Sequence, residues 1–353
     1  MSSLRNVLSG VPQGSIIGPL LFVLFINDIT AGLTPGTNIA MYADDTKNWR
    51  SINCENDHKL LQNDVNYLHS WSIVNQMKFH PAKCKVLSVS HLRQPLLGIL
   101  PEIEFMYFLG NAILDYHTEE KDLGVKINCK LNWNDHCNYL ISKANQKFGL
   151  LRRTCHFVKN PNRRRVLYLT LVRSIFEHCP IVWRPSSKLA LQSLEDVQKR
   201  AIKWILDDYT SCSKELYIIK CKQLDLLPVS KRLQLFDLTF FHQIFYKCSP
   251  VQFPQYLTPY QGSRLRSSHL DNLCLVSSAT PNSASRGTSD NNHLPRNFGN
   301  SYFYRAHLAR NRVPYDTRNT RCQSTFRTLV TNLFWKELME RVHNDSDCDL
   351  QPD

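Results

Sequence analysis

The chain has 353 residues, of which 42% are hydrophobic, so it is not wholly disordered and has room for two or three domains. Its formal net charge of +13 favours a polyanionic partner. The positive charge is concentrated in the second half: residues 143–203 contain 14 basic and 3 acidic residues, and residues 261–327 contain 10 and 3. This concentration is typical of a binding face, whereas a solvated helix surface usually mixes both signs.

The twelve cysteines do not indicate a disulfide-stabilised secreted protein. The chain is too long for a small stapled domain, and no CxxC or CxxH pair has the spacing of a zinc site. The first ten residues contain no apolar core of signal-peptide length. The most apolar run, residues 16–29, includes Asn27 and Asp28 and is shorter than the roughly 20 residues that span a bilayer. We therefore expect an intracellular protein, in the nucleus or the cytoplasm, with free thiols and no membrane partner.

The first motif is a glycine- and proline-rich loop followed by a very apolar segment. Residues 10–19, GVPQGSIIGP, contain three glycines and two prolines, which favour a bent loop over a strand or a helix. We expect a helix over residues 19–29, with Asn27 and Asp28 as caps at its end. Residues 20–26 are apolar on every face of that helix, so the pattern predicts a helix buried on all sides.

Two adjacent aspartates follow a short apolar segment. Residues 39–43 predict a buried strand that ends at Asp44 and Asp45. Neighbouring strand residues point to opposite faces, so both carboxylates can reach one site only where the chain bends, as at the tip of a hairpin. Two carboxylates with no His or Cys nearby favour Mg²⁺ or Mn²⁺, because the cation relieves their repulsion. An isolated Asp-Asp pair at a turn is usually solvated, which is the alternative.

The pattern then changes from mixed α/β to helical. The apolar spacing of residues 55–77 predicts an amphipathic helix, and residues 86–89 and 122–127 predict strands. Further helices are predicted over residues 135–157, 161–180, 189–206, 224–246 (one or two helices) and 324–342, with a loop over residues 277–300. The change near residue 130 predicts a domain boundary.

The order of these motifs resembles the palm of reverse transcriptases. The segment GVPQGSIIGPLLFVLFINDI (residues 10–29) is similar to that family's loop-and-helix element, and YADDT (residues 42–46) is similar to its metal-binding hairpin. Later segments are similar to family elements in the expected order: MKFHPAKC (77–84), DLGV (122–125) and the helical residues 150–204. Within the family the chain most resembles the polymerases of non-LTR, LINE-type retrotransposons of the jockey and chicken-repeat kind.

This resemblance implies a role for each matching residue. Asp44 and Asp45 would hold the metals of a two-metal nucleotidyl transfer, in which a dNTP is added to a DNA primer on an RNA template. Tyr42 would lie against the primer end, with a packed strand residue as the alternative, and Ala43 would keep the approach to the metals small. Lys83 would approach the triphosphate, with an exposed structural lysine as the alternative. The incoming nucleotide and template base would be bordered by Gln13, Gly14 and Ser15.

The basic helices stand where the family has its thumb domain. A thumb would follow the phosphates of the template–primer duplex through contacts that do not depend on base sequence. The residues expected to make these contacts are Arg152, Arg153, Arg163, Arg164, Arg165, Arg173, Lys199 and Arg200. For residues 163–165 the alternatives are a localisation signal and a solvated helix start.

The chain departs from the family pattern before the glycine loop. The family needs a third metal ligand, an aspartate on a strand some tens of residues earlier, but only nine residues, none of them acidic, precede Gly10. We therefore expect a C-terminal fragment of a polymerase that lacks the fingers, is poorly soluble and does not extend a primer by itself. The alternative is a non-catalytic nucleic-acid-binding remnant.

Together these patterns predict an α+β fold in three parts. Residues 1–130 would form a partial palm with a β-hairpin and packed helices. Residues 131–210 would form a basic, helical, thumb-like domain. Residues 211–353 would form a C-terminal extension that contains the loop at 277–300 and an acidic tail.

Overall fold

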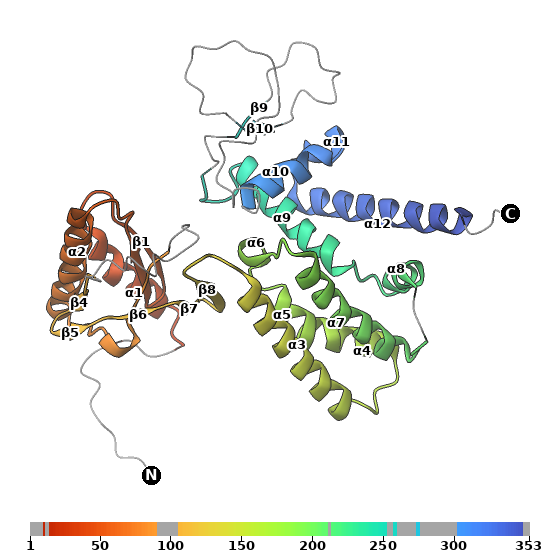
Figure 1. The fold of residues 1–353 in the computed structure, drawn as a ribbon, viewed down its shortest axis with the longest axis horizontal. Helices are drawn as coiled ribbons and strands as arrows, with labels where there is room; N and C mark the ends of the chain where they lie inside the picture. The colour runs from red at the N-terminus through yellow and green to blue at the C-terminus, as the bar shows by residue number, and fades with distance from the viewer. Residues whose placement is uncertain are drawn as a thin grey trace, which may run out of the picture. The chain divides into compact units, whose positions relative to one another are not determined.

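The computed structural model describes residues 10, 14–89, 105–210, 213–252, 257–259, 273–275 and 302–348. These residues adopt a mixed α+β fold that divides into two compact units (Figure 1). Unit 1 comprises Met1–Glu120 with Asn128–Leu131, and unit 2 comprises Lys121–Ile127 with Asn132–Asp353. The division passes through the paired strands β7 (Glu119–Asp122) and β8 (Val125–Asn128).

Unit 1 combines helices with short pairs of strands. Helix α1 (Gly18–Ile26) continues into a 3₁₀ turn (Asn27–Thr30), and strands β1 (Asn38–Tyr42) and β2 (Asp45–Trp49) follow. The remaining elements are α2 (Glu55–Val74), a second 3₁₀ turn (Pro81–Lys83), β3 (Lys85–Leu87), β4 (Phe108–Leu109), β5 (Ala112–Ile113) and β6 (Asp115–His117). Strands β1 and β2 pair antiparallel, as do β4 and β5, while β3 and β6 pair in parallel.

Helix α2 organises the core of unit 1. Its buried residues recur three or four positions apart, as the apolar spacing predicts for an amphipathic helix. Leu68 and Trp71 pack with Ile26 and Ile29 in one cluster, and Val65 belongs to a second cluster with residues of β4 and the chain around it. The predicted helix over residues 55–77 is confirmed as far as Val74.

Two predictions about burial in unit 1 are wrong. Helix α1 is not buried on all sides: Gly18 and Ile26 are its buried residues, whereas Leu20 and Leu24 are 61% and 65% exposed. Strand β1 is exposed at every residue except the half-buried Ile39. An apolar sequence shows what a segment could bury, but the described residues of unit 1 cover only one side of α1.

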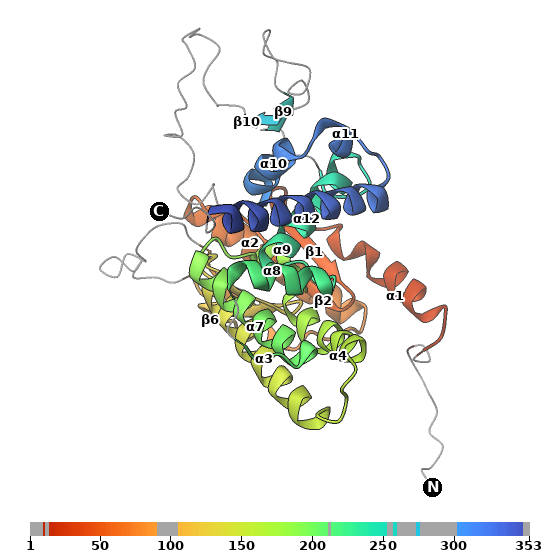
Figure 2. The same ribbon diagram turned by 90° about the vertical axis from the view of Figure 1, so that its right-hand side faces the viewer.

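Unit 2 is helical and contains one large buried cluster. Its helices are α3 (Asn134–Thr154), α4 (Pro161–Tyr168), a π-helical turn (Leu169–Arg173), α5 (Ser174–Phe176), α6 (Pro180–Trp183), α7 (Lys188–Leu206), α8 (Lys214–Gln223), α9 (Val229–Phe245), α10 (Tyr302–Arg312), α11 (Tyr315–Arg318) and α12 (Gln323–Cys348). Strands β9 (Leu257–Pro259) and β10 (Leu273–Leu275) pair antiparallel. Helices α3 and α4 both pack against α7, and α10 and α12 both pack against α9 (Figures 1 and 2).

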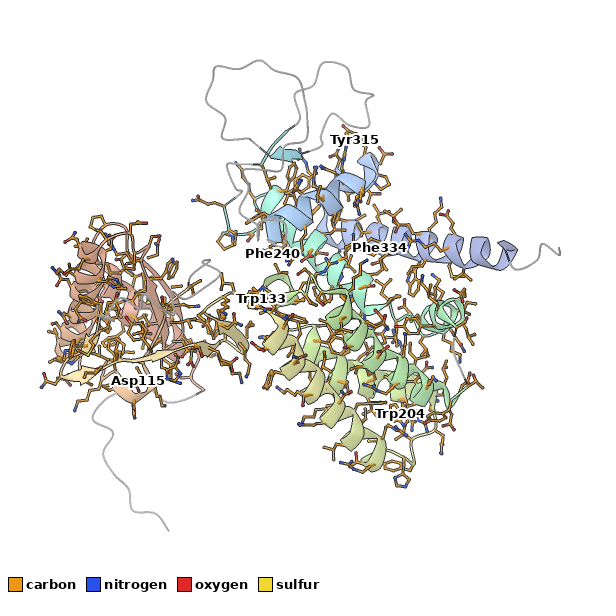
Figure 3. All side chains as sticks on the ribbon, in the orientation of Figure 1. Asp115, Trp133, Trp204, Phe240, Tyr315 and Phe334 are labelled. Carbon is orange, nitrogen blue, oxygen red and sulfur yellow. The ribbon has the colours of Figure 1, made fainter. Side chains whose placement is uncertain are left out.

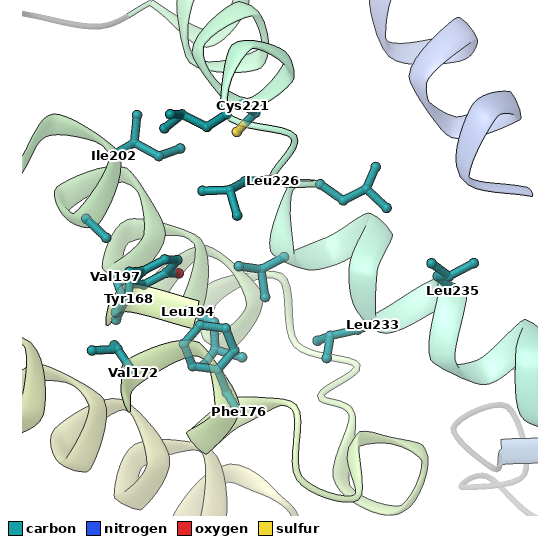
Figure 4. Close-up of a cluster of buried hydrophobic side chains, with 14 of the residues drawn as sticks. Tyr168, Val172, Phe176, Leu194, Val197, Ile202, Cys221, Leu226, Leu233 and Leu235 are labelled. Carbon is teal, nitrogen blue, oxygen red and sulfur yellow. The ribbon is translucent and has the colours of Figure 1, made fainter. Parts of the chain in front are cut away.

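The buried cluster joins helices from the whole length of unit 2. Tyr168, Phe176, Leu194 and Leu233 are each at most 1% exposed and face the same interior (Figure 4). Phe334 of α12 belongs to the same cluster. Residues on both sides of position 210 therefore share one core, while their separate roles as a thumb and an extension stay predictions.

Two predicted elements of unit 2 are interrupted. The predicted helix over residues 161–180 is split into α4, the π-helical turn and α5, and Cys179, at φ +47°, stands before α6. The predicted strand over residues 122–127 turns back at Leu123 and Gly124, at φ +45° and +90°. The predicted loop over residues 277–300 lies outside the described residues. No helix in the described part of the chain is both long and apolar enough to cross a membrane.

Candidate active site

The β1–β2 hairpin places Asp44 and Asp45 at a tight turn. Tyr42 pairs with Asp45 across the ladder, so Ala43 and Asp44 alone connect the two strands. Two-residue hairpin turns need a left-handed backbone conformation, and Ala43 adopts φ +52°. The prediction that the aspartate pair lies at the tip of a hairpin is confirmed.

Both aspartates are exposed at this tip. Carboxylate oxygens are the ligands that Mg²⁺ and Mn²⁺ prefer, and Mg²⁺ commonly keeps several waters while one or two carboxylates hold it. The donor set at the turn therefore fits a hydrated divalent cation. Among the described residues, no group of three or more His, Cys, Asp and Glu side chains is arranged to hold a metal ion.

The base of the hairpin is held by Arg50, the residue directly after β2. Its Nη1 donates to the Pro35 carbonyl and to the Thr37 hydroxyl, each at 3.0 Å. Its Nε lies 3.3 Å from Oδ1 of Asp57 in α2, and the arginine side chain is only 11% exposed. These contacts connect the end of β2 to the turn before β1 and to the first turn of α2.

Asp57 is itself fixed by the start of α2. Its Oδ2 accepts hydrogen bonds from the backbone N–H groups of Asn53 at 2.9 Å and Cys54 at 3.1 Å. These bonds, with those from the Cys54 thiol and Arg50, lower the pKa of Asp57 to about 2. The carboxylate therefore stays charged beside Arg50 near neutral pH.

Sequence reasoning missed the residues that support the hairpin. Asp57 could have been found, because an acidic residue at the third position of a helix is a capping-box signal. Asp64 is buried in α2 and accepts hydrogen bonds from the N–H of Thr34 at 2.7 Å and from its hydroxyl at 2.8 Å. No local signal identifies this pair, since thirty positions separate the two residues.

The glycine loop is described from Gly14 onward, with Gly10 before it, and Gln13 lies outside the described residues. Gly14 is exposed at φ +82°, a conformation that suits glycine. The hydroxyl of Ser15 accepts a hydrogen bond from the Gly18 N–H at 3.1 Å, which stabilises the start of α1. Contacts of Gln13, Gly14 and Ser15 with a nucleotide or a template base stay predictions.

Helix α1 and the hairpin share one hydrophobic cluster. Phe22 of α1 and Ile39 of β1 both pack against the buried cluster that contains Ile29 and Trp71. The Trp71 Nε1–H also donates to Oδ1 of Asp28 at 2.9 Å, so Asp28 holds the end of the helical segment. The loop-and-helix element and the aspartate hairpin are therefore parts of one packed structure.

Tyr42 and Lys83 are both on the surface of unit 1. Tyr42 is 68% exposed, so it is not a packed strand residue within the described part of unit 1. Lys83 ends the turn Pro81–Lys83, where its side chain is exposed and its N–H donates to the His80 carbonyl at 2.9 Å. Contacts of Tyr42 with a primer and of Lys83 with a triphosphate stay predictions.

Two of the eight basic residues predicted to contact phosphates are buried. Arg164 is 2% exposed, donates to the carbonyls of Val158 and Trp204, and lies over the Trp204 ring. Arg173 is 3% exposed, pairs with Glu177 at 2.7 Å and donates to the Leu227 carbonyl at 3.0 Å. Both guanidinium groups act inside unit 2, and we do not retain them as phosphate ligands.

The other basic residues differ in how strongly they are held. Arg165 donates to the Leu224 carbonyl, and Lys199 lies 3.3 Å from an Asp196 oxygen. Arg200 of α7 donates to the Asn145 side chain of α3 at 2.6 Å, which connects two neighbouring helices at the surface. The exposed arginines of this set are Arg152, Arg153, Arg163 and Arg200.

Residues 2–142 match the family of reverse transcriptases (RNA-dependent DNA polymerases). This segment contains the glycine loop, α1 and the aspartate hairpin. Over this segment, which carries the hairpin, the chain is similar to reverse transcriptases. The relatives are polymerases of non-LTR mobile elements, which confirms the resemblance inferred from the motifs.

Three curated relatives are polymerases of insect mobile elements. The chain is 27% identical over 223 residues to the probable RNA-directed DNA polymerase from transposon BS of Drosophila melanogaster, across 58% of this chain and 23% of that protein. It is 28% identical to the RNA-directed DNA polymerase from mobile element jockey of Drosophila melanogaster, across 38% of this chain and 15% of the relative. For the jockey polymerase of Drosophila funebris the identity is 26%, across 39% and 15%. The chain thus spans less than a quarter of each relative, and no solved structure matches it.

Proposed function

We propose that unit 1 is part of the catalytic palm of a non-LTR RNA-directed DNA polymerase, with Asp44 and Asp45 as ligands of Mg²⁺ or Mn²⁺. The observation that carries this proposal is the two-residue turn that exposes both aspartates within the reverse transcriptase segment. When bound, the divalent cations would activate the primer 3′-hydroxyl and neutralise charge on the dNTP phosphates.

The other residues of unit 1 would position the substrates. Tyr42, exposed beside the turn, offers a flat apolar surface to the primer end, and Ala43 leaves the aspartates accessible because its side chain is a single methyl group. Lys83 would add a positive charge near the triphosphate. The nucleotide and the template base would be bordered by Gln13, Gly14 and Ser15.

The nucleic-acid partner would be a duplex of RNA template and DNA primer. Helices α3, α4 and α7 carry exposed basic residues that suit contacts with phosphates of either strand. The residues proposed for these contacts are Arg152, Arg153, Arg163, Lys199 and Arg200. Arg165 is proposed with them, and its side chain also donates to the Leu224 carbonyl.

We further propose that this chain by itself extends primers poorly or not at all. Two carboxylates supply few of the six oxygen ligands that each Mg²⁺ needs, and defined two-metal geometry requires more fixed ligands than the hairpin offers. The supporting observation is that the hairpin presents two aspartates, both exposed to solvent.

A primer-extension assay tests the proposed inactivity of this chain, and any incorporation would also test the role of Asp44. The full chain is incubated with poly(rA)·oligo(dT), dTTP and Mg²⁺ or Mn²⁺, and incorporation is compared with that of Asp44→Asn. We expect no incorporation above the Asp44→Asn background. Robust incorporation that Asp44→Asn abolishes would contradict the inactivity of this chain and support the metal-binding role of the hairpin.

The nucleic-acid-binding alternative is tested separately by filter binding to an RNA–DNA hybrid. If the exposed arginines contact phosphates, the double substitution Arg152→Gln/Arg153→Gln should lower the slope of log K against log salt by about 1.8 for duplex contacts. The control is Lys214→Gln, which alters an exposed residue at the start of α8. It should change the slope by less than about 0.9, the contribution of one phosphate contact.

A further inference from the structure

Helices α9, α10 and α12 enclose a cavity of about 210 Å³ in unit 2, outside the segment that matches reverse transcriptases. Each helix contributes residues with helical spacing, so one face of each helix forms a wall. The residues are Lys231, Gln234 and Leu238 from α9, Ala309 and Arg312 from α10 with Val313 after it, and Leu333, Phe334, Glu337 and Arg341 from α12.

The cavity carries an excess of positive charge. Lys231 pairs with Glu337, with 2.6 Å between Nζ and Oε2, so one cation is neutralised by the single carboxylate that lines the cavity. Arg312 and Arg341 are exposed, and neither forms a hydrogen bond or an ion pair with another described residue. Two guanidinium groups therefore remain available among the residues that line the cavity, and their positive charge favours binding of an anion there.

The lining and the size of the cavity define the class of anion. Arginine presents several N–H donors in a planar fork that matches phosphate oxygens. The lining also includes the aromatic ring of Phe334 on α12 (Figure 3), and the Lys231 Nζ lies 4.5 Å from the centre of that ring. The volume is below the roughly 300–1,000 Å³ of sites for drug-sized ligands but is ample for a phosphate group and an attached sugar.

We propose that this cavity binds a phosphate group through Arg312 and Arg341, beside the Lys231–Glu337 ion pair. The phosphate belongs either to a nucleic-acid strand or to a small phosphorylated ligand. The proposal does not depend on the function of the aspartate hairpin, because the cavity is formed wholly by residues of unit 2.

Modification of arginines by phenylglyoxal, mapped by mass spectrometry on the full chain, tests the proposal. One arm contains inorganic phosphate and the other contains the single-stranded oligonucleotide oligo(dT)₁₂, with chloride keeping the ionic strength equal. At a ligand concentration about ten times its Kd, modification of Arg312 and Arg341 should slow about tenfold, since about one site in eleven is then free. Arg321, which is exposed before α12 and does not line the cavity, is the control in the phosphate arm and should react at an unchanged rate.

The two arms separate the sources of the phosphate. Protection by oligo(dT)₁₂, with or without protection by inorganic phosphate, assigns the cavity to a nucleic-acid strand, and protection by inorganic phosphate alone assigns it to a small phosphorylated ligand. Equal modification of Arg312 and Arg341 with and without both probes would overturn the proposal, as would slowing of Arg321 to the same degree by inorganic phosphate.

A pair of variants checks the strand assignment. If oligo(dT)₁₂ protects, Arg312→Gln/Arg341→Gln should lower the salt slope of oligonucleotide binding by about 1.4, because each contact with a single strand contributes about 0.7. The control Lys214→Gln/Lys336→Gln removes two exposed charges, one of them on α12, that do not line the cavity. An equal fall in slope for both variants would overturn the assignment to this cavity.

Discussion

At the scale of single residues, position and burial separate side chains that are alike in sequence. Arg164 and Arg173 lie in the same basic stretch as Arg152, yet they are buried and donate to backbone carbonyls, while Arg152 is exposed. A buried arginine must satisfy its donors inside the protein, so its role is structural. Asp44, exposed at the hairpin turn, differs in the same way from Asp64, which is hydrogen-bonded within unit 1.

Ala43 is expected to carry local strain at the hairpin turn. Its φ of +52° lies in the left-handed region, which costs a non-glycine residue about 1–2 kcal/mol. Ala43→Gly removes this strain but also adds conformational entropy to the unfolded chain, which partly offsets the gain. The substitution should therefore raise the free energy of unfolding by up to about 1 kcal/mol. Urea unfolding measures the change. Ala40→Gly, at an exposed strand position, is the control and should lower stability by about 0.5–1 kcal/mol.

His136 is expected to make unit 2 less stable in acid. Burial, with smaller contributions from His178 and Lys126, lowers the pKa of His136 to about 4, and its Nδ1 accepts the Lys126 N–H at 3.1 Å. Between pH 6.5 and about 4 the unfolded histidine binds a proton that the folded one does not, so stability falls as the pH falls through this window.

The variant His136→Asn isolates this contribution, because asparagine keeps an acceptor near the position of Nδ1 but does not titrate. Urea unfolding from pH 4 to pH 7 should show a smaller loss of stability in the variant than in the parent chain. Parallel pH profiles for the two proteins would show that His136 does not contribute.

At the scale of elements, α1 illustrates the limit of an apolar pattern. Its sequence is apolar on every face, but the described part of unit 1 packs against it mainly through Phe22, Phe25 and Ile26. Leu20, Leu21, Val23 and Leu24 are exposed. The apolar area of a helix determines how much free energy its burial can contribute, but it does not determine which segment covers each face. We therefore expect the exposed apolar surface of α1 to promote self-association.

Substitution on α1 should therefore separate solubility from stability. Leu20→Gln/Leu24→Gln alters two exposed residues and should change the free energy of unfolding by less than about 0.5 kcal/mol per site while reducing self-association. Ile26→Gln, a buried residue of the same helix, should destabilise by about 2 kcal/mol or more. Sedimentation velocity and urea unfolding measure the two effects. Unchanged self-association in the double variant would contradict the role of α1.

At the scale of the whole molecule, the two units differ in the size of their cores. Unit 1 has two small clusters that both include residues of α2, whereas one continuous cluster runs from Val125 to Val342 in unit 2. Larger cores resist local opening, because more apolar surface is exposed when they unfold.

Native-state hydrogen exchange should therefore distinguish the units. The amides of α7, which buries Leu194, Val197 and Ile202, should exchange more slowly than those of α2 by at least about tenfold, the factor that corresponds to 1.4 kcal/mol of opening free energy. Mass spectrometry of peptic peptides measures this. Equal protection of α2 and α7 across a urea series would show that the two units unfold together.

The amino-acid sequence by itself determined the features that depend on neighbours in the chain. The helices over residues 134–154 and 188–206, the loop that enters α1 and the hairpin turn at the aspartates follow from apolar period, glycine and proline placement, and polar residues at a strand end. The resemblance to reverse transcriptases also came from local motifs, and the family match over residues 2–142 supports it.

Only the tertiary structure decided which side chains meet across long separations. It buried Arg164 and Arg173, joined Arg50 to the turn before β1, left most of α1 uncovered by described residues, and brought Lys231, Arg312 and Arg341 to one cavity. The physical reason is that burial and charge pairing depend on the packing of distant segments, which the local periodicity of a sequence does not encode.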